Sequence, residues 1–138
     1  MDTEILVIEQ KEAGVEFLRN FSKDFPVDAA FWLKETDIED WYLYIVSSEI
    51  TNENMSEAYR KVLELVKPNQ SIWLDPFRVK LLDSEKELAK RVLEVKSRFV
   101  GAMATYYNAS SIAGVPIDAC FIYQNIEQKL PLETEKLL

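Results

Sequence analysis

The chain of 138 residues contains no histidine, one cysteine and three glycines. Without histidine a protein has neither a Ser-His-Asp triad nor a Cys-His nucleophile pair, and it lacks the imidazole ligand that most zinc sites use. The single cysteine, Cys120, cannot form a disulfide within the chain or build a cysteine metal cluster. The sequence therefore excludes the hydrolases that depend on those groups, and we expect no metal site.

The three glycines, Gly14, Gly101 and Gly114, lie far apart in the sequence. A Walker A loop and the GxGxxG dinucleotide fingerprint both need glycines within a few residues of one another, because the backbone must approach a phosphate closely. Neither motif can be written anywhere in the chain. We therefore expect no nucleotide cofactor and no other cofactor.

Long apolar runs and an excess of positive charge are also absent. No apolar run approaches the ~20 residues of a membrane-spanning helix, and the N-terminus carries Asp2 and Glu4 where a signal peptide carries basic residues. The net charge of -8 repels polyphosphate. We therefore expect a soluble, cytoplasmic protein that binds neither nucleic acid nor membrane.

Helical periodicity of the apolar residues predicts three helices. The first covers about 10–24 and ends because Pro26 disfavours helical backbone for the residue before it. The second covers about 54–67 and ends before Pro68, and the third covers 85–98, where the apolar stripe is most regular. Each helix should bury one apolar side against the rest of the core.

Runs rich in aromatic and β-branched residues predict a hairpin near the N-terminus and extended segments near the C-terminus. Segments 28–34 and 41–48 flank the acidic stretch 35–40, which indicates a β-hairpin with a longer loop. The later extended segments, which we interpret as a closing hairpin, are 103–107, 111–113 and 117–123.

A further strand is expected over 77–82, because apolar and basic residues alternate there. Phe77, Val79 and Leu81 would face the core. The period of two therefore predicts a short strand between the second and third helices.

The element order α-ββ-α-β-α-ββ predicts an α+β fold, or a mixed-sheet α/β fold, with a single sheet of about five strands and helices packed on it. Crossovers over 41–82 and 77–107 predict parallel neighbouring strands, while the two hairpins predict antiparallel ones. We expect one globular domain over 1–138. The pattern leaves open whether 5–8 is helix or strand, and whether 127–138 is a short docked helix or a frayed tail.

The first predicted hairpin is apolar on both faces, which an antiparallel hairpin with one side in water should not be. Its second face must therefore be covered by a helix, by a partner subunit or by a ligand. Strand alternation places on the first face Phe31, Leu33, Trp41, Leu43 and Ile45. On the opposite face, called here the aromatic face, it places Trp32, Tyr42, Tyr44 and Val46, with Arg78 and Lys80 if the third strand has the matching register.

The acidic loop between the first two strands could in principle hold a hard cation, because calcium takes oxygen ligands at alternate positions. The loop lacks the glycine and the terminal glutamate of an EF-hand. Its acidic residues are Glu35, Asp37, Glu39 and Asp40. We interpret them as a solvated hairpin tip.

Asp118 lies inside an otherwise apolar strand, so its carboxylate needs hydrogen bonds or water. Alternation places it on one side of the strand with Cys120 and Ile122. We interpret Cys120 as a buried, inert thiol, because no base lies near it in the sequence to lower its pKa. Asp118 is either a structural partner or a general acid or base, with Tyr107 or Tyr123 as the second group.

Two functions are compatible with this sequence. The preferred hypothesis is a non-enzymatic accessory or interaction protein that homodimerises through the aromatic face, because aromatic residues with a polar tip are enriched in interfaces. The alternative is a small enzyme or binding protein for an anionic metabolite, which Tyr42, Tyr44, Arg78 and Lys80 would hold.

Overall fold

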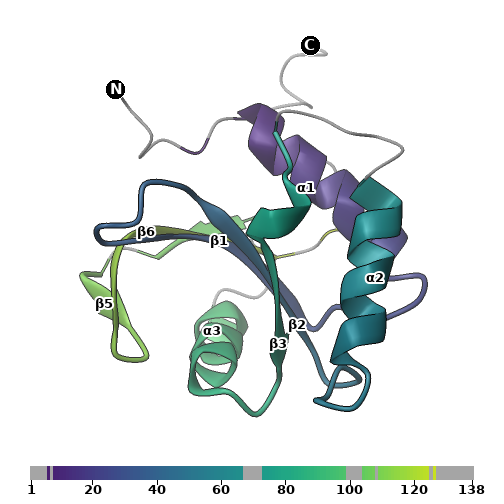
Figure 1. The fold of residues 1–138 in the computed structure, drawn as a ribbon. Coiled ribbons are helices and arrows are strands. Elements are labelled where there is room, and N and C mark those ends of the chain that lie inside the picture. The colour runs from purple at the N-terminus through teal and green to yellow at the C-terminus, as the bar shows by residue number, and fades with distance from the viewer. Residues whose placement is uncertain are drawn as a thin grey trace.

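The computed structural model describes residues 6, 8–66, 73–98, 104–107, 109–124 and 126. These residues form a mixed sheet with helices on both sides of it (Figure 1). In chain order the elements are α1 (Ile8–Phe21), β1 (Ala29–Glu35), β2 (Tyr42–Ser47), α2 (Met55–Val66), the 3-10 turn η1 (Pro76–Arg78), β3 (Val79–Asp83), α3 (Glu87–Arg98), β4 (Ala104–Tyr106), β5 (Ser111–Ile112) and β6 (Val115–Tyr123). The strands follow the order β3-β2-β1-β6-β4, and β5 pairs with β6 beside them. The predicted α+β fold with a single mixed sheet is confirmed.

The helices begin and end close to the predicted positions. α1 runs from Ile8 to Phe21, whereas the prediction was 10–24. α2 and α3 agree with their predictions to within two residues. Of the segment 5–8, which the sequence left open, Ile8 is helical and residues 5 and 7 lie outside the described part. The segment 127–138 lies outside it as well.

The closing hairpin is formed by β5 and β6. Ile112 pairs with Val115, so that Ala113 and Gly114 alone make the turn. Their φ angles are 51° and 83°. Two successive positive φ angles in a two-residue loop are the geometry of a type I′ turn, whose twist matches that of the flanking strands. Glycine adopts this backbone without steric cost, which accounts for Gly114.

The register of the first hairpin differs from the prediction by one residue. In the structure Trp32 lies opposite Leu43, and Phe31 lies opposite Tyr44. Residues directly opposite one another share a face of the sheet, so Trp32 belongs with Leu43 and not with Tyr44. The predicted aromatic face, which grouped Trp32 with Tyr42 and Tyr44, is therefore wrong. The loop between the strands sets this register, and a shift of one residue exchanges the faces.

Helices cover both faces of the sheet (Figure 1). Trp32 and Leu43 belong to a buried cluster with residues of α1 and α2. Phe31 and Tyr44 belong to a second cluster, on the other side, with residues of α3. The sequence left open whether a helix, a partner subunit or a ligand covers the second apolar face. In the structure, a helix of the same chain, α3, covers it.

One of the two predicted crossovers is confirmed and the other is wrong. β2 and β3 are parallel neighbours, as the crossover through α2 predicts. β3 and β4 are not neighbours, because β4 lies at the opposite edge of the sheet, antiparallel to β6. Both sides of β2 are occupied, by β1 and β3, and the chain after α3 reaches the far edge beyond β6.

The third strand begins two residues later than predicted. The carboxylate of Asp75 accepts a hydrogen bond from Phe77 N–H at 2.9 Å, and Pro76 opens the turn η1. The turn removes Phe77 from the alternation of the strand, and its side chain is 82% exposed. The prediction that Phe77 faces the core is wrong, whereas Val79 and Leu81 are buried as predicted.

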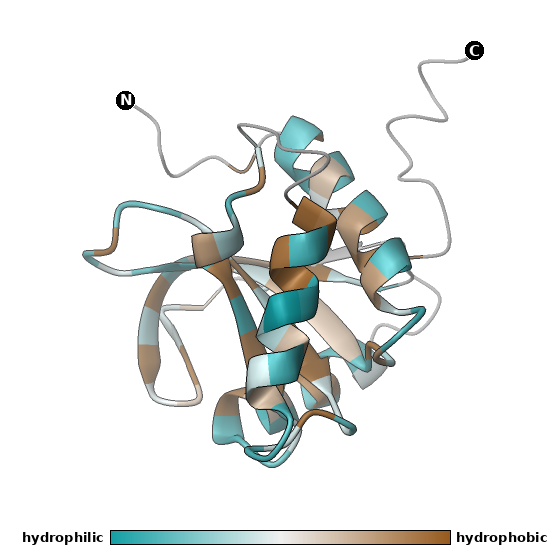
Figure 2. Cartoon of the chain, turned by 45° about the vertical axis from the view of Figure 1, so that its right-hand side comes forward, coloured by the Kyte–Doolittle hydropathy of each residue, from teal (hydrophilic) through white to brown (hydrophobic). Residues whose placement is uncertain are grey.

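Hydrophilic and hydrophobic residues alternate along α1 and α2 (Figure 2), as expected for helices with one buried side. Within the described residues, no helix combines the length and the apolar composition needed to cross a bilayer.

Candidate functional site

The tyrosines of the predicted anion site are engaged in contacts within the chain. Tyr44 is buried, its ring stacks on Phe31 with centroids 5.1 Å apart, and its hydroxyl donates to Glu35 Oε2 at 3.0 Å. Burial, and then the hydrogen bond to Glu35, raise the pKa of this hydroxyl. Tyr44 therefore remains protonated and donates to a carboxylate of its own chain.

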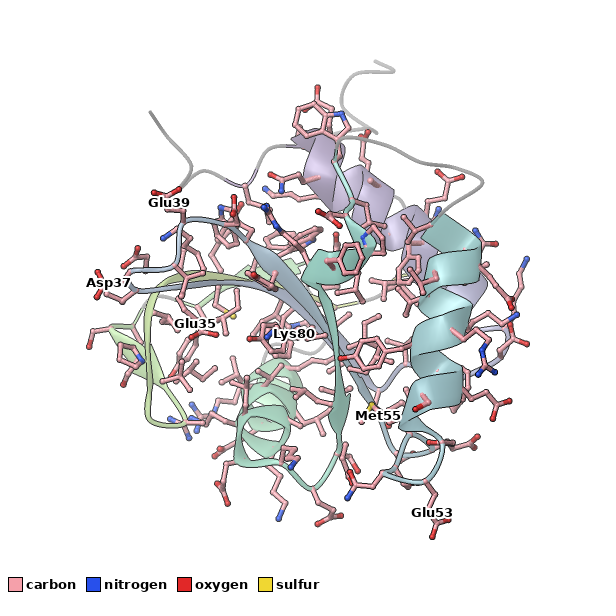
Figure 3. All side chains as sticks on the ribbon, viewed as in Figure 1. Glu35, Asp37, Glu39, Glu53, Met55 and Lys80 are labelled. Carbon is pink, nitrogen blue, oxygen red and sulfur yellow. The ribbon has the colours of Figure 1, made fainter. Side chains whose placement is uncertain are left out.

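The two basic residues of that predicted site are engaged as well. Lys80 Nζ lies 5.1 Å from the ring centroid of Tyr42, a cation–π distance. Arg78 forms an ion pair with Asp40 at 2.9 Å. Figure 3 shows Glu35 and Lys80 on the side of the sheet on which α3 lies. In the register of β2 and β3, Lys80 lies opposite Tyr44, whereas Arg78 belongs to the turn η1.

Trp32 lies on the opposite face and takes part in a different network. Its indole N–H donates to the hydroxyl oxygen of Tyr123 at 2.9 Å, and that hydroxyl donates to Lys11 O at 2.6 Å. Tyr123 is buried, and burial raises its pKa. Through the hydroxyl of Tyr123, this arrangement ties α1 to β1 and β6.

Asp118 occupies a β-bulge. Lys34 pairs with Ala119 and Glu35 pairs with Ile117, so Asp118 has no partner in β1. The bulge brings its Oδ2 to 3.0 Å from Lys34 Nζ, whose side chain is only 5% exposed.

The predicted grouping of Asp118 is therefore wrong. Ile117, and not Asp118, joins Cys120 and Ile122 in the cluster beneath α3. The Asp118 carboxylate neutralises a buried ammonium and also accepts a hydrogen bond from Thr36 Oγ1 at 3.3 Å. Its described contacts include neither Tyr107 nor Tyr123.

Tyr107 N–H donates to Cys120 O at 3.0 Å, and Tyr107 packs against the buried cluster that contains Cys120. Tyr107 and Arg91 of α3 both line a shallow pocket. The pKa of Arg91 is raised by its hydrogen bond with Tyr107 and, to a smaller extent, by its hydrogen bond with Glu94. Cys120 is buried, and burial raises the pKa of its thiol to about 12. The predicted burial of the thiol is confirmed, and its raised pKa keeps it protonated near neutral pH.

The structure leaves two large apolar side chains exposed, one in the loop between β1 and β2 and one in the turn η1. Ile38, in the loop between β1 and β2, is 42% exposed, and Phe77 is 82% exposed. An ion pair between Asp40 and Arg78 joins the loop to the turn. Asp40 lies two positions after Ile38, and Arg78 directly follows Phe77. We call the set Asp37, Ile38, Glu39 and Phe77, with this ion pair, the loop-turn surface.

Backbone contacts hold the loop in place. Thr36 N–H donates to Pro116 O at 3.1 Å, and Ile38 N–H donates to Glu35 O at 3.1 Å. Asp37 has a φ of 69°, a conformation that aspartate tolerates better than most residues. Asp37 and Glu39 lie toward the outer end of the loop (Figure 3). The predicted solvated acidic tip is therefore confirmed for Asp37 and Glu39, whereas Glu35 belongs to β1 and Asp40 is paired with Arg78.

The sequence contained a signal for the position of Phe77. Asp75 followed by Pro76 is an N-cap residue with proline at the first position of a helical turn. This pair predicts a turn over the next residues, which interrupts the alternation that otherwise suggests a strand. The proline–aspartate signal and the alternation compete over the same residues, and the turn prevails.

Comparisons with known proteins return no match: no protein-family model, no curated protein and no solved structure is similar to this chain. Within the described residues, no group of three or more cysteine or acidic side chains is arranged to hold a metal ion. The functional argument therefore rests on the residues themselves.

Proposed function

We propose that this protein is a non-enzymatic interaction module of the cytoplasm that docks a basic protein partner on the loop-turn surface. The observation that carries the proposal is the 82% exposure of Phe77. An aromatic side chain that is solvated in the free protein loses apolar surface to water on docking, and aromatic anchors dominate many interfaces.

Phe77 is held in place before any partner binds. Its N–H is bound by Asp75, Pro76 restricts the backbone before it, and Val79 N–H closes the turn on Pro76 O. The ion pair of Arg78 with Asp40 fixes the next residue. A rigid anchor loses little conformational entropy on binding, which favours affinity.

The charge around the two apolar side chains favours a basic partner. Asp37 and Glu39 are exposed beside Ile38, whereas Arg78 is neutralised by Asp40. The whole chain carries a net charge of -8. A partner with lysine or arginine around an apolar centre complements this surface, and a second copy of the chain would bring acid against acid. Homodimerisation stays a prediction, and we do not assign it to this surface.

The outer edge of β3, near the loop-turn surface, is less suited to docking. Val79 N–H donates to Pro76 O, and Leu81 N–H donates to the hydroxyl oxygen of Tyr59 at 2.9 Å, so neither group is available to an incoming strand. An edge whose donors are used within the chain resists pairing with another strand. Side-chain contacts are therefore the favoured mode of binding.

The proposal is tested by selecting binders from a displayed peptide library against the immobilised protein. We expect enriched peptides to carry an aromatic or aliphatic anchor flanked by lysine or arginine. Phe77→Ser should weaken binding of such a peptide by at least about tenfold in a fluorescence titration. Leu63→Ser is the matched control, because Leu63 is also exposed, on α2, and lies outside this surface.

Phe77→Ser should leave the melting temperature nearly unchanged, since an exposed side chain contributes little to stability. Asp37→Asn combined with Glu39→Gln should slow association and reduce its dependence on salt. Failure to enrich any peptide, enrichment of acidic peptides, or equal binding by the parent and Phe77→Ser would each refute the proposal.

A further inference from the structure

A pocket of about 250 Å³ lies at the opposite end of β1 from the loop-turn surface, where β1 begins and β6 ends. Four parts of the chain meet there: the segment between α1 and β1, the first residues of β1, the last turn of α3 and the end of β6. The residues that line it are Ser22, Val27, Ala29, Ala30, Lys96, Tyr123, Gln124 and Ile126.

Lys96 is the charged side chain of this pocket. Its ammonium donates to Asp28 O at 3.0 Å, which uses one of its three protons. The side chain is half-buried and forms no ion pair with any carboxylate of the described residues. Two donors of a partly desolvated cation therefore remain available to a ligand.

The nearest acidic group does not neutralise Lys96 by contact. Oδ2 of Asp28 accepts the backbone N–H of Ser48 at 2.7 Å. Desolvation lowers the pKa of Lys96, and the opposing effect of the Asp28 charge is the smaller of the two. An anion that paired with the ammonium would offset the free-energy cost of this desolvation.

The rest of the lining is suited to a short apolar group. Val27 and Ile126 are apolar and half-buried, whereas the side chains of Ala29 and Ala30 are almost completely buried. Arg19 Nε donates to Ile126 O at 2.7 Å, which anchors Ile126. The Ser22 hydroxyl donates to Arg19 O at 2.9 Å. One cation beside apolar side chains matches a ligand with one negative charge and a short hydrocarbon tail.

We propose that this pocket binds a short-chain monocarboxylate, with its carboxylate on Lys96 and its tail against Val27 and Ile126. Inorganic phosphate fits less well, because a doubly charged oxyanion needs more donors than one ammonium supplies. The site is independent of the loop-turn surface and does not rest on the proposed docking of a partner.

The test is a titration of the protein with butyrate, followed by NMR on the backbone amides and the lysine side chains. We expect saturable shifts at Lys96, Ala29 and Ala30 with a dissociation constant in the millimolar range. Butyramide has the same shape without the charge, and it should bind at least about tenfold more weakly. Inorganic phosphate should also bind more weakly than butyrate.

Two variants locate the binding. Lys96→Met removes the charge and retains most of the stem, and it should weaken butyrate binding by at least about tenfold. Lys90→Met, on the exposed side of the same helix where Lys90 pairs with Glu85, should bind butyrate like the parent. If Lys96→Met does not fold, the shift of the Lys96 side-chain resonance on addition of butyrate to the parent protein tests the proposal.

Any of three results would overturn the proposal. They are unchanged butyrate affinity in a folded Lys96→Met variant, no shift of the Lys96 side-chain resonance in the parent, and phosphate binding tighter than butyrate. None of them bears on peptide binding at Phe77, so the two proposals fail separately.

Discussion

The hydroxyl of Tyr123 joins three elements of the fold, because it bonds both Trp32 Nε1 in β1 and Lys11 O in α1. Gly14, one turn along α1, makes room for this network. A Cβ at that position would lie 2.6 Å from the hydroxyl oxygen and 3.2 Å from Trp32 Nε1. At the scale of the residue, the absence of a side chain at Gly14 is therefore a packing requirement.

We expect Gly14→Ala to lower the free energy of unfolding by about 1–3 kcal/mol, because the added methyl must displace a hydroxyl that is bonded on both sides. Urea unfolding measures the effect. In a Tyr123→Phe background the same substitution should cost less, since the crowded oxygen is gone. Equal unfolding midpoints for the parent and Gly14→Ala would show that the helix does not approach the sheet this closely.

Cys120 makes stability depend on pH. Burial raises the pKa of its thiol to about 12, from an ordinary value of 9.0. The unfolded chain therefore loses this proton at a lower pH than the folded protein does. The stabilisation is fully present below the ordinary pKa and is lost as the pH rises toward the folded value, by about 1.4 kcal/mol per pH unit for one proton.

Urea unfolding between about pH 8 and about pH 10 should reveal this loss in the parent and a smaller one in Cys120→Ala. The buried hydroxyls of Tyr44 and Tyr123 act only at higher pH, because their ordinary pKa is 10.0. Because Cys120→Ala also leaves a small cavity, the quantity to compare is the change in unfolding free energy with pH and not its absolute value. Parallel curves for the two proteins would contradict the assignment.

At the scale of the element, α3 covers the side of the sheet that carries Phe31 and Tyr44. Its buried residues Ala89, Val92 and Val95 are spaced at helical intervals and are at most 1% exposed. The opposite side of the helix carries ion pairs in water, such as Glu94 with Arg98 at 3.0 Å. The apolar stripe of α3 accounts for its docking, and the exposed pairs contribute little.

Val92→Asp should abolish cooperative unfolding, because a buried carboxylate without a partner costs several kcal/mol against a total stability of ~5–15 kcal/mol. Circular dichroism during heating measures this. Lys90→Asp places the same residue on the solvated side of α3, and it should retain a cooperative transition. A folded Val92→Asp variant would mean that this stripe is not the buried side of the helix.

At the scale of the whole molecule, both faces of the sheet are covered and the two candidate sites lie at its opposite ends. The loop-turn surface follows the end of β1, and the Lys96 pocket lies at its beginning. A protein with a covered sheet on both sides presents its binding groups at loops and strand ends, where backbone polar groups can be solvated.

Tyr44→Glu tests the covering of the sheet. Tyr44 is 6% exposed beneath α3, and its hydroxyl already bonds Glu35, so a second carboxylate would be buried beside the first. We expect a large loss of stability in urea and an unchanged mass in light scattering. A dimeric parent that Tyr44→Glu splits without loss of stability would instead restore an interface at this residue.

Most of the local structure was determined by the sequence alone. The stripes of α2 and α3 and the composition of β1 and β2 placed these elements to within two residues. The burial of Cys120 and the exposure of the acidic loop tip were also predictable. Each of these features depends on spacing within one segment, and the geometry of a helix or strand sets that spacing regardless of what lies around it.

Tertiary structure decided how the elements meet. Whether Trp32 shares a face with Leu43 or Tyr44 depends on the loop between the strands, and one residue of shift reverses the answer. The bulge that turns Asp118 toward Lys34 and the position of β4 beyond β6 follow from competition among strands far apart in the chain. The exposure of Phe77 and the pocket around Lys96 arise in the same way, because burial is a property of the assembled surfaces and no single segment contains it.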